Sequence, residues 1–193
     1  EPDDLGNNVP LEGVTIRLED GSGIEAVTDA NGAFALGSED VDEDGIADGL
    51  PAPTFFVAID GSTATAQAGQ PIPENGFYPI VDKPFHSVPG QTVPLKMDGE
   101  PFDIYLPFVL NEAIQAVVPG EATVATLPEE QTQEDPSLTL LRLDVPADSL
   151  VDNEGNPGTE VGVFRVDSAR LPAPLPDGLD HSFDITVQAD VTN

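Results

Sequence analysis

The chain has 193 residues, no cysteine, and a formal net charge of −30 from 36 acidic and 6 basic residues. Without cysteine it has neither a disulfide framework nor a thiolate metal site. Its negative field repels nucleic acid and anionic membranes, and no apolar run of about 18 residues is present, so we expect neither nucleic-acid binding nor membrane insertion.

The excess of carboxylates has three possible explanations: halophilic adaptation to salty surroundings, binding of divalent cations, and plain solubility. The first two are compatible with each other. If the chain folds only when its carboxylates are screened, it should melt more easily at low ionic strength.

Short apolar runs punctuated by 20 Pro and 18 Gly predict an all-β fold. Residues 14–18 and 34–36 alternate with period two, so each predicts a strand. Between them, residues 28–32 end in Asn-Gly, which predicts a hairpin turn because both residues tolerate positive φ. The β-branched and aromatic residues 55–59 predict the next strand.

The rest of the chain continues this pattern. Residues 77–95 are apolar but broken by four prolines, which predicts edge strands and crossing loops. Residues 108–118, between two prolines, could alternatively form a short helix, and the acidic residues 128–136 predict a mobile loop. Further strands are expected at 102–110, 122–127, 138–145, 161–166 and 183–187.

A chain of this length can form one large β domain or two small ones. We expect two β sandwiches in tandem, residues 1–98 and 99–193, with the boundary near Asp98 and Gly99.

One segment carries a metal-binding pattern. Carboxylates stand at positions 1, 3, 5 and 9 of an acidic loop, and Gly45 stands at position 6. Alternate oxygen ligands let a loop wrap around Ca²⁺, and Gly at position 6 permits the turn that points the next carbonyl inward. The expected calcium ligands are Asp40, Asp42, Asp44, the carbonyl of Ile46, and Asp48.

This loop resembles the Asp-x-Asp-x-Asp-Gly-x-x-Asp calcium loops of dockerin and thrombospondin type 3 repeats. Such loops usually close with an acidic residue at position 12, where this chain has Pro51. The missing ligand would then come from a neighbouring segment, with Glu39, Asp20 and Asp60 as candidates. The alternative is an exposed acidic turn that binds nothing.

Other motifs are weaker. Residues 152–156 have alternating oxygen donors, but they are better explained as a hairpin turn. His86 and His181 have no Cys or His partner at zinc-binding spacing, and no nucleophile motif or phosphate loop is present. Paired carboxylates for sugar hydrolysis would need aromatic platforms, yet the chain has no Trp and only Tyr78 and Tyr105. We therefore expect no catalytic residues and no enzyme activity.

Three stretches resemble the transthyretin-like, or prealbumin-like, modules known as carboxypeptidase regulatory-like domains and as Cna-B and Sdr B repeats. They are residues 10–16 (Pro-Leu-Glu-Gly-Val-Thr-Ile), 27–36 (Val-Thr-Asp-Ala-Asn-Gly-Ala-Phe-Ala-Leu) and 55–59 (Phe-Phe-Val-Ala-Ile). The resemblance implies a transthyretin-like sandwich stabilised by calcium, as in Sdr B repeats. Lys83 and Lys96 match no position of the Lys to Asn isopeptide bond of Cna-B modules, so none is inferred. Residues 138–190 loosely resemble ZU5-type extracellular β domains.

These observations predict a non-catalytic, calcium-stabilised structural or adhesive segment of an extracellular or cell-surface protein. Its partners would be neighbouring domains, copies of the same protein, or an extracellular protein or glycan. One alternative is a subunit of a homopolymeric filament in which an edge strand or residues 1–9 pair with the next copy. Another is a carbohydrate-binding module with a calcium-bridged sugar contact.

Overall fold

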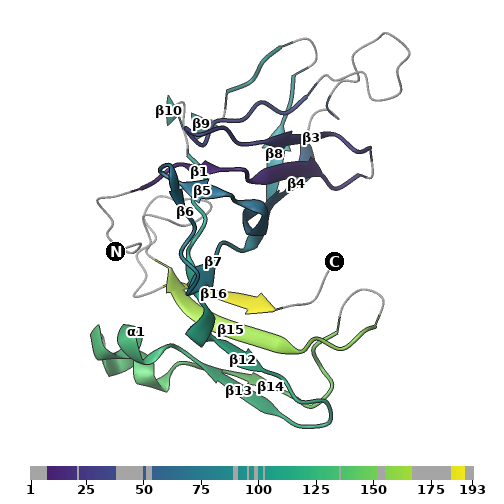
Figure 1. The fold of residues 1–193 in the computed structure, drawn as a ribbon. Coiled ribbons are helices and arrows are strands. Elements are labelled where there is room, and N and C mark those ends of the chain that lie inside the picture. Colours follow the sequence, from purple (N-terminus) through teal and green to yellow (C-terminus); the bar gives the residue numbers. More distant parts are fainter. Residues whose placement is uncertain are drawn as a thin grey trace. The chain divides into compact units, whose positions relative to one another are not determined.

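The computed structural model shows an all-β protein built from short antiparallel strands (Figure 1). Contacts between residues divide the chain into two compact units, here called the first unit (Glu1–Phe108) and the second unit (Val109–Asn193). None of the described helices is long and apolar enough to cross a membrane. The structure describes residues 8–20, 22–37, 50, 54–88, 91–94, 96–97, 100–101, 103–134, 136–151, 155–166 and 184–189.

The main sheet of the first unit has four antiparallel strands in the order β3-β2-β4-β8. They are β3 (Glu25–Val27), β2 (Thr15–Leu18), β4 (Thr54–Asp60) and β8 (Ile80–His86). The strands predicted at 14–18 and 55–59 are thus confirmed. The edge position expected for the proline-broken region is confirmed for β8, which contains Pro84 and stands last in the sheet.

Smaller strands complete the first unit. β1 (Leu11–Glu12) pairs with β5 (Ala66–Gln67), which also pairs with β6 (Gln70–Pro71), and β9 (Lys96–Met97) pairs with β10 (Glu100–Pro101). The remaining elements are β7 (Gly76–Phe77) and a 3₁₀ turn, η1 (Gly61–Thr63).

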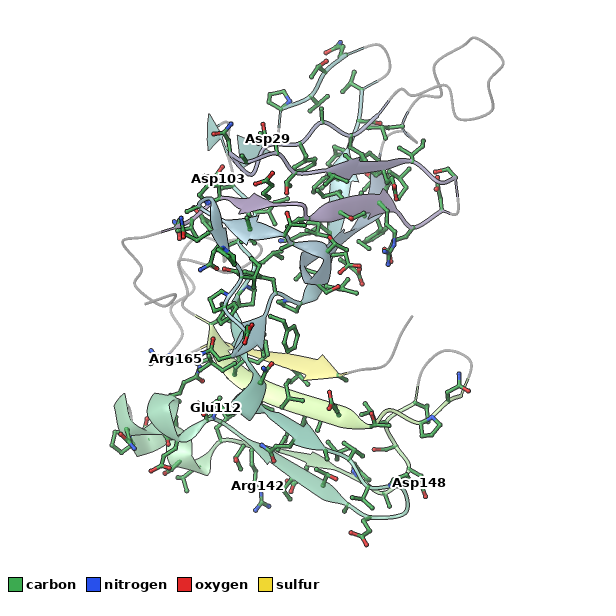
Figure 2. All side chains as sticks on the ribbon, in the orientation of Figure 1. Asp29, Asp103, Glu112, Arg142, Asp148 and Arg165 are labelled. Carbon is green, nitrogen blue, oxygen red and sulfur yellow. The ribbon has the colours of Figure 1, made fainter. Side chains whose placement is uncertain are left out.

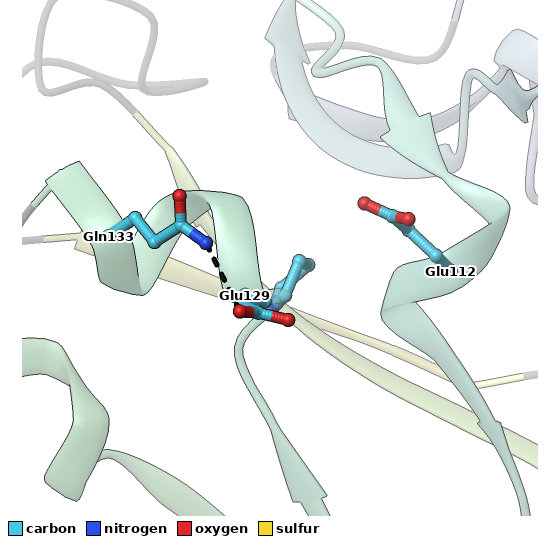
Figure 3. A pocket seen from close by; sticks show the side chains of 4 residues that line it. Glu112, Glu129 and Gln133 are labelled. Carbon is cyan, nitrogen blue, oxygen red and sulfur yellow. Dashed lines mark hydrogen bonds between the residues drawn. The ribbon is translucent and has the colours of Figure 1, made fainter.

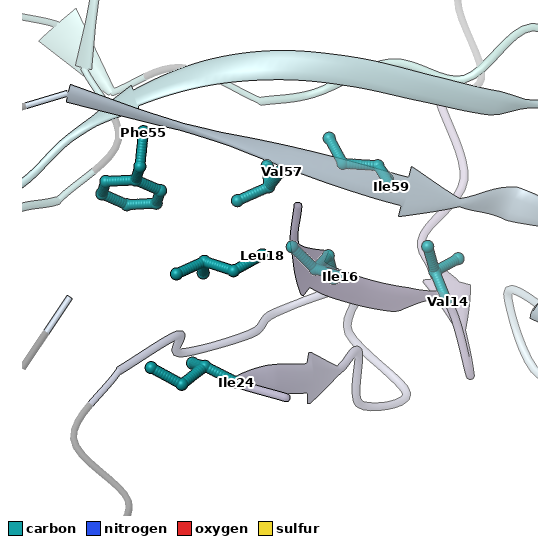
Figure 4. Close-up of a cluster of buried hydrophobic side chains, with 7 residues drawn as sticks. All are labelled: Val14, Ile16, Leu18, Ile24, Phe55, Val57 and Ile59. Atoms are coloured by element: carbon teal, nitrogen blue, oxygen red, sulfur yellow. The ribbon is translucent and has the colours of Figure 1, made fainter. Parts of the chain in front are cut away.

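The core of the first unit lies on one face of the four-stranded sheet. Strand alternation and register place Ile16 opposite Ile59 and Leu18 opposite Val57, all of them buried. Burying each such side chain contributes about 1.5–3 kcal/mol. Figure 4 shows the cluster, which comprises Val14, Ile16, Leu18, Ile24, Phe55, Val57 and Ile59.

The turn expected at residues 28–32 is found, because the amide of Asp29 donates a hydrogen bond of 2.9 Å to the carbonyl of Ala33 and the amide of Gly32 donates one to the carbonyl of Asp29. The strand expected at residues 34–36 is not found. Residues 33–37 are irregular, although Phe34 and Leu36 still pack against the core. The carboxylate of Asp29 also accepts hydrogen bonds from the amides of Asn31 and Ala33. These bonds hold the pKa of Asp29 below its usual value, and the bond from Ala33 takes up an amide at the point where a second strand would begin.

The second unit contains a three-stranded and a two-stranded antiparallel sheet. The first has the order β12-β15-β16, with β12 (Ile114–Ala116), β15 (Glu160–Val166) and β16 (Asp184–Ala189). The second pairs β13 (Thr123–Thr126) with β14 (Arg142–Val145). These elements confirm strands at 122–127, 161–166 and 183–187. Their buried cluster is Ala125, Leu127, Leu138, Val145, Val161 and Val163.

Two turns of the second unit are joined by a side chain. Asp148, labelled in Figure 2, has a φ of +56°, and its carboxylate accepts a hydrogen bond of 2.8 Å from the amide of Gly120. Because Asp adopts this left-handed conformation more readily than most residues, the bond is formed at a modest cost in strain.

The helical alternative for residues 108–118 is excluded, and two expectations for residues 128–145 need correction. Residues 109–116 form β11 (Val109–Leu110), the 3₁₀ turn η2 (Asn111–Ala113) and β12, because Ile114 and its neighbours pair with β15. The expected loop contains the helix α1 (Glu129–Glu134), and the amide of Arg165 binds the side chain of Gln131 within it. The strand expected from residue 138 begins at residue 142. The residues before it form the 3₁₀ turn η3 (Pro136–Leu140), and this turn places Leu138 in the core.

The two units divide after Phe108, and Ile104 and Leu106 pack against the core of the first unit. The expected boundary residues, Asp98 and Gly99, lie outside the described residues. The division at 98/99 and the tandem-sandwich architecture therefore stay predictions.

Candidate functional site

The expected calcium ligands Asp40, Asp42, Asp44, Ile46 and Asp48 lie outside the residues that the structure describes. Within the described part of the chain, no three His, Asp or Glu side chains gather in a way that could hold a metal ion. The calcium site therefore remains a prediction, and what can be examined is the structure on either side of it.

The residues that flank the acidic segment 38–49 lie close together in the first unit. Gly37 has a φ of +131°, and a Cβ added to it would lie 3.3 Å from Cγ of Leu50. Leu36 and Leu50, on the two sides of the segment, both pack against the buried core. The described residues on the two sides of the acidic segment are therefore held near each other by apolar packing.

This anchoring matters for the electrostatics of the segment. It carries six carboxylates, at residues 39, 40, 42, 43, 44 and 48. Two like charges 4 Å apart repel each other by about 1 kcal/mol in water and about 4 kcal/mol near a protein surface. Because Gly37 and Leu50 lie close together, only 12 residues lie between two neighbouring points of the chain, and six of them are acidic.

Of the three residues considered for completing the calcium shell, Asp60 is already engaged. It is buried at the end of β4, and one carboxylate oxygen accepts hydrogen bonds from the amide (3.1 Å) and the hydroxyl (2.5 Å) of Ser62. Its other oxygen lies 3.5 Å from the guanidinium of Arg17. These contacts cap η1 and make Asp60 a poor metal ligand.

Asp20 is the better candidate of the two that the structure describes. It is exposed in the turn between β2 and β3, where its carboxylate accepts a hydrogen bond of 2.9 Å from the amide of Ser22. Hydrogen bonds from the side chain and the backbone of Ser22 lower its pKa, so it is ionised at neutral pH. Glu39 lies outside the described residues.

Lys83 is the residue that sequence reasoning missed. It lies on β8 directly opposite Val57, on the core-facing side of the sheet, and is only 8% exposed. Burial lowers the pKa of its amine, and no ion pair or hydrogen bond of this amine is seen among the described residues. A signal was present in the sequence, because Val81, Lys83 and Phe85 alternate on one face of a strand.

The second unit has a hollow of about 430 Å³ lined by Glu112, Pro128, Glu129 and Gln133 (Figure 3). The amide of Gln133 donates a hydrogen bond of 3.1 Å to the carboxylate of Glu129. This lining is polar and acidic and lacks the apolar and aromatic surface typical of small-molecule sites. It therefore suggests no substrate.

One of the two histidines, His86, makes a contact across two strands. The ring Nδ1 of His86 lies 3.2 Å from the hydroxyl of Thr54, its cross-strand neighbour, and both residues are exposed. This contact is a surface cross-strand pair between β4 and β8. His181 lies outside the described residues.

Comparison with protein-family models, with curated proteins and with solved structures finds no match for the chain. Any statement about its function therefore rests on its own residues.

Proposed function

We propose that the chain is a non-catalytic, calcium-stabilised structural or adhesive segment of an extracellular or cell-surface protein. In this proposal it consists of two β-sandwich modules, of which the first is transthyretin-like. The observation that supports it is the close approach of Gly37 and Leu50, the described residues on the two sides of the acidic segment that contains Asp40, Asp42, Asp44 and Asp48.

In the proposed mechanism, calcium offsets the repulsion among these carboxylates and stiffens the segment between Leu36 and β4. Because the unfolded chain cannot present the ligands together, the free energy of calcium binding becomes free energy of folding. Calcium sites of extracellular modules have dissociation constants of about 10⁻⁴–10⁻³ M. At calcium concentrations ten times the dissociation constant, the stabilisation is about 1.4 kcal/mol.

Thermal melting of the full chain in calcium and in EDTA tests this proposal. We expect calcium to raise the melting temperature of the first unit by roughly 5 °C or more, and Asp42→Ala to abolish the rise. The matched control is Asp82→Ala, which removes an exposed carboxylate from β8 and should keep the full rise. Equal melting temperatures in calcium and EDTA would defeat the proposal.

A further inference from the structure

The turn at residues 29–33 contains an asparagine followed by a glycine, Asn31 and Gly32. Such a pair is chemically labile in a flexible chain. The backbone nitrogen of the glycine loses its proton to base in the solvent and attacks Cγ of the asparagine, a C–N bond forms, and ammonia leaves with a proton taken from water. A water molecule then opens the succinimide ring to aspartate or isoaspartate. Glycine permits the attack because it has no side chain to hinder the approach.

Four hydrogen bonds close this turn around the reactive pair. The amides of Asn31 (2.8 Å) and Ala33 (3.0 Å) donate to one carboxylate oxygen of Asp29. The amide of Gly32 donates to the carbonyl of Asp29, and the amide of Asp29 donates to the carbonyl of Ala33, each at 2.9 Å. Three consecutive amides, those of residues 31–33, are therefore bound by Asp29.

The turn is also anchored on both sides. Gly32 has a φ of +72°, in the left-handed region that glycine adopts readily, and a Cβ added to it would lie 3.3 Å from Cβ of Pro10. After the turn, Phe34 and Leu36 pack against the core of the first unit. The side chain of Asn31 stays exposed to water. The labile amide is thus accessible, whereas the backbone around it is held.

These contacts oppose the cyclisation. To attack Cγ of Asn31, the nitrogen of Gly32 must give up the hydrogen that it donates to the carbonyl of Asp29 and turn toward the side chain, which breaks the turn. The bonds from the amides of Ala33 and Asn31 lower the pKa of the Asp29 carboxylate, so it is ionised at neutral and alkaline pH. A negative charge this close also disfavours the deprotonated amide that the reaction needs.

We propose that Asn31 is a latent deamidation site that the turn centred on Asp29 protects. The reaction then proceeds only from molecules in which the turn is open, and its rate follows the free energy of opening. Conversion adds a negative charge to a chain of charge −30, and the isoaspartyl product lengthens the main chain within the turn. The inference does not depend on calcium binding.

Deamidation of the full chain at mildly alkaline pH, with and without urea, tests the protection. Cleavage after glutamate places Asn31 and the other Asn-Gly pair, Asn75 and Gly76, in different peptides, and the mass increase of the Asn31 peptide gives its rate. We expect Asn31 to react at least about tenfold more slowly in the folded chain than in urea, which corresponds to about 1.4 kcal/mol of barrier. Equal rates with and without urea would overturn the proposal.

Three substitutions separate the turn from the stability of the whole unit. Asp29→Ala removes the two bonds to the carboxylate and should raise the rate at Asn31 about fivefold or more, because these bonds favour the closed turn. Asp29→Asn keeps a side-chain oxygen that can accept both bonds and should keep most of the protection. The control is Ile59→Val, a mild destabilisation of the buried core that leaves the turn intact and should leave the rate unchanged. An equal acceleration by Asp29→Ala and Ile59→Val would assign the protection to the whole unit and overturn the role of Asp29.

Discussion

Replacing Lys83 by Met should stabilise the first unit. The two side chains are similar in length, so Met can follow the same path along β8 and keep contact with the core. What the substitution removes is a buried ammonium group without a described partner, opposite Val57. An unsatisfied buried polar group costs about 1–3 kcal/mol, and the 8% exposure of Lys83 favours the lower part of that range. We expect a gain of about 1–2 kcal/mol.

The gain should depend on pH. Burial lowers the pKa of Lys83 in the folded state, so between that pKa and the unfolded value of about 10.4 the unfolded chain binds more protons. The stability of the wild type therefore rises with pH across this window. It follows that Lys83→Met has its full advantage below the folded pKa and loses it as the pH passes about 10.4.

Thermal melts at neutral pH and at about pH 10.5 measure both effects. For a domain of about 100 residues, each kcal/mol shifts the melting temperature by roughly 4–8 °C. Arg142→Met is the matched control, because it also removes one positive charge, from a side chain that is 62% exposed, and should change stability by less than about 0.5 kcal/mol. A lower melting temperature for Lys83→Met than for this control would refute the reasoning.

Two further substitutions test the architecture of the first unit. Thr28→Val should lower the free energy of unfolding, measured in urea, by about 1–3 kcal/mol. The Thr28 hydroxyl accepts a hydrogen bond from the buried amide of Val14 and donates one to the carbonyl of Leu11, and both would be lost. An unchanged urea midpoint would show that the amide finds another partner. Ala68→Asn should raise the melting temperature by a few degrees. Ala68 has a φ of +46°, and Asn tolerates this left-handed conformation better than Ala does. A decrease in the melting temperature would mean that the turn is not strained.

The strands that could be predicted from the sequence are those in which burial itself produces the pattern. β2, β4 and β15 have β-branched or aromatic side chains on a buried face, and this regularity is visible in the sequence. Residues 34–36 have the same apolar alternation but form no ladder with any described strand, and the amide of Ala33 just before them binds the carboxylate of Asp29. Leu138 also belongs to a stretch that was expected to be a strand, but it lies in the 3₁₀ turn η3. A single side chain can reach the core without an extended backbone.

The candidate site likewise has one part that could be predicted from the sequence and one part that could not. Its liganding pattern is local, so the spacing of Asp40, Asp42, Asp44 and Asp48 could be recognised from the sequence alone. The contact between Gly37 and Leu50 could not, because it depends on how two leucines distant from the motif pack against the core.

The charge of the chain affects calcium binding and folding in different ways. A chain of charge −30 attracts calcium, and added salt screens this attraction, so salt alone should weaken calcium binding. The same salt reduces the repulsion among the carboxylates of the folded chain, so it should raise the melting temperature measured in EDTA. The difference between the melting temperatures in calcium and in EDTA should therefore shrink as salt is added.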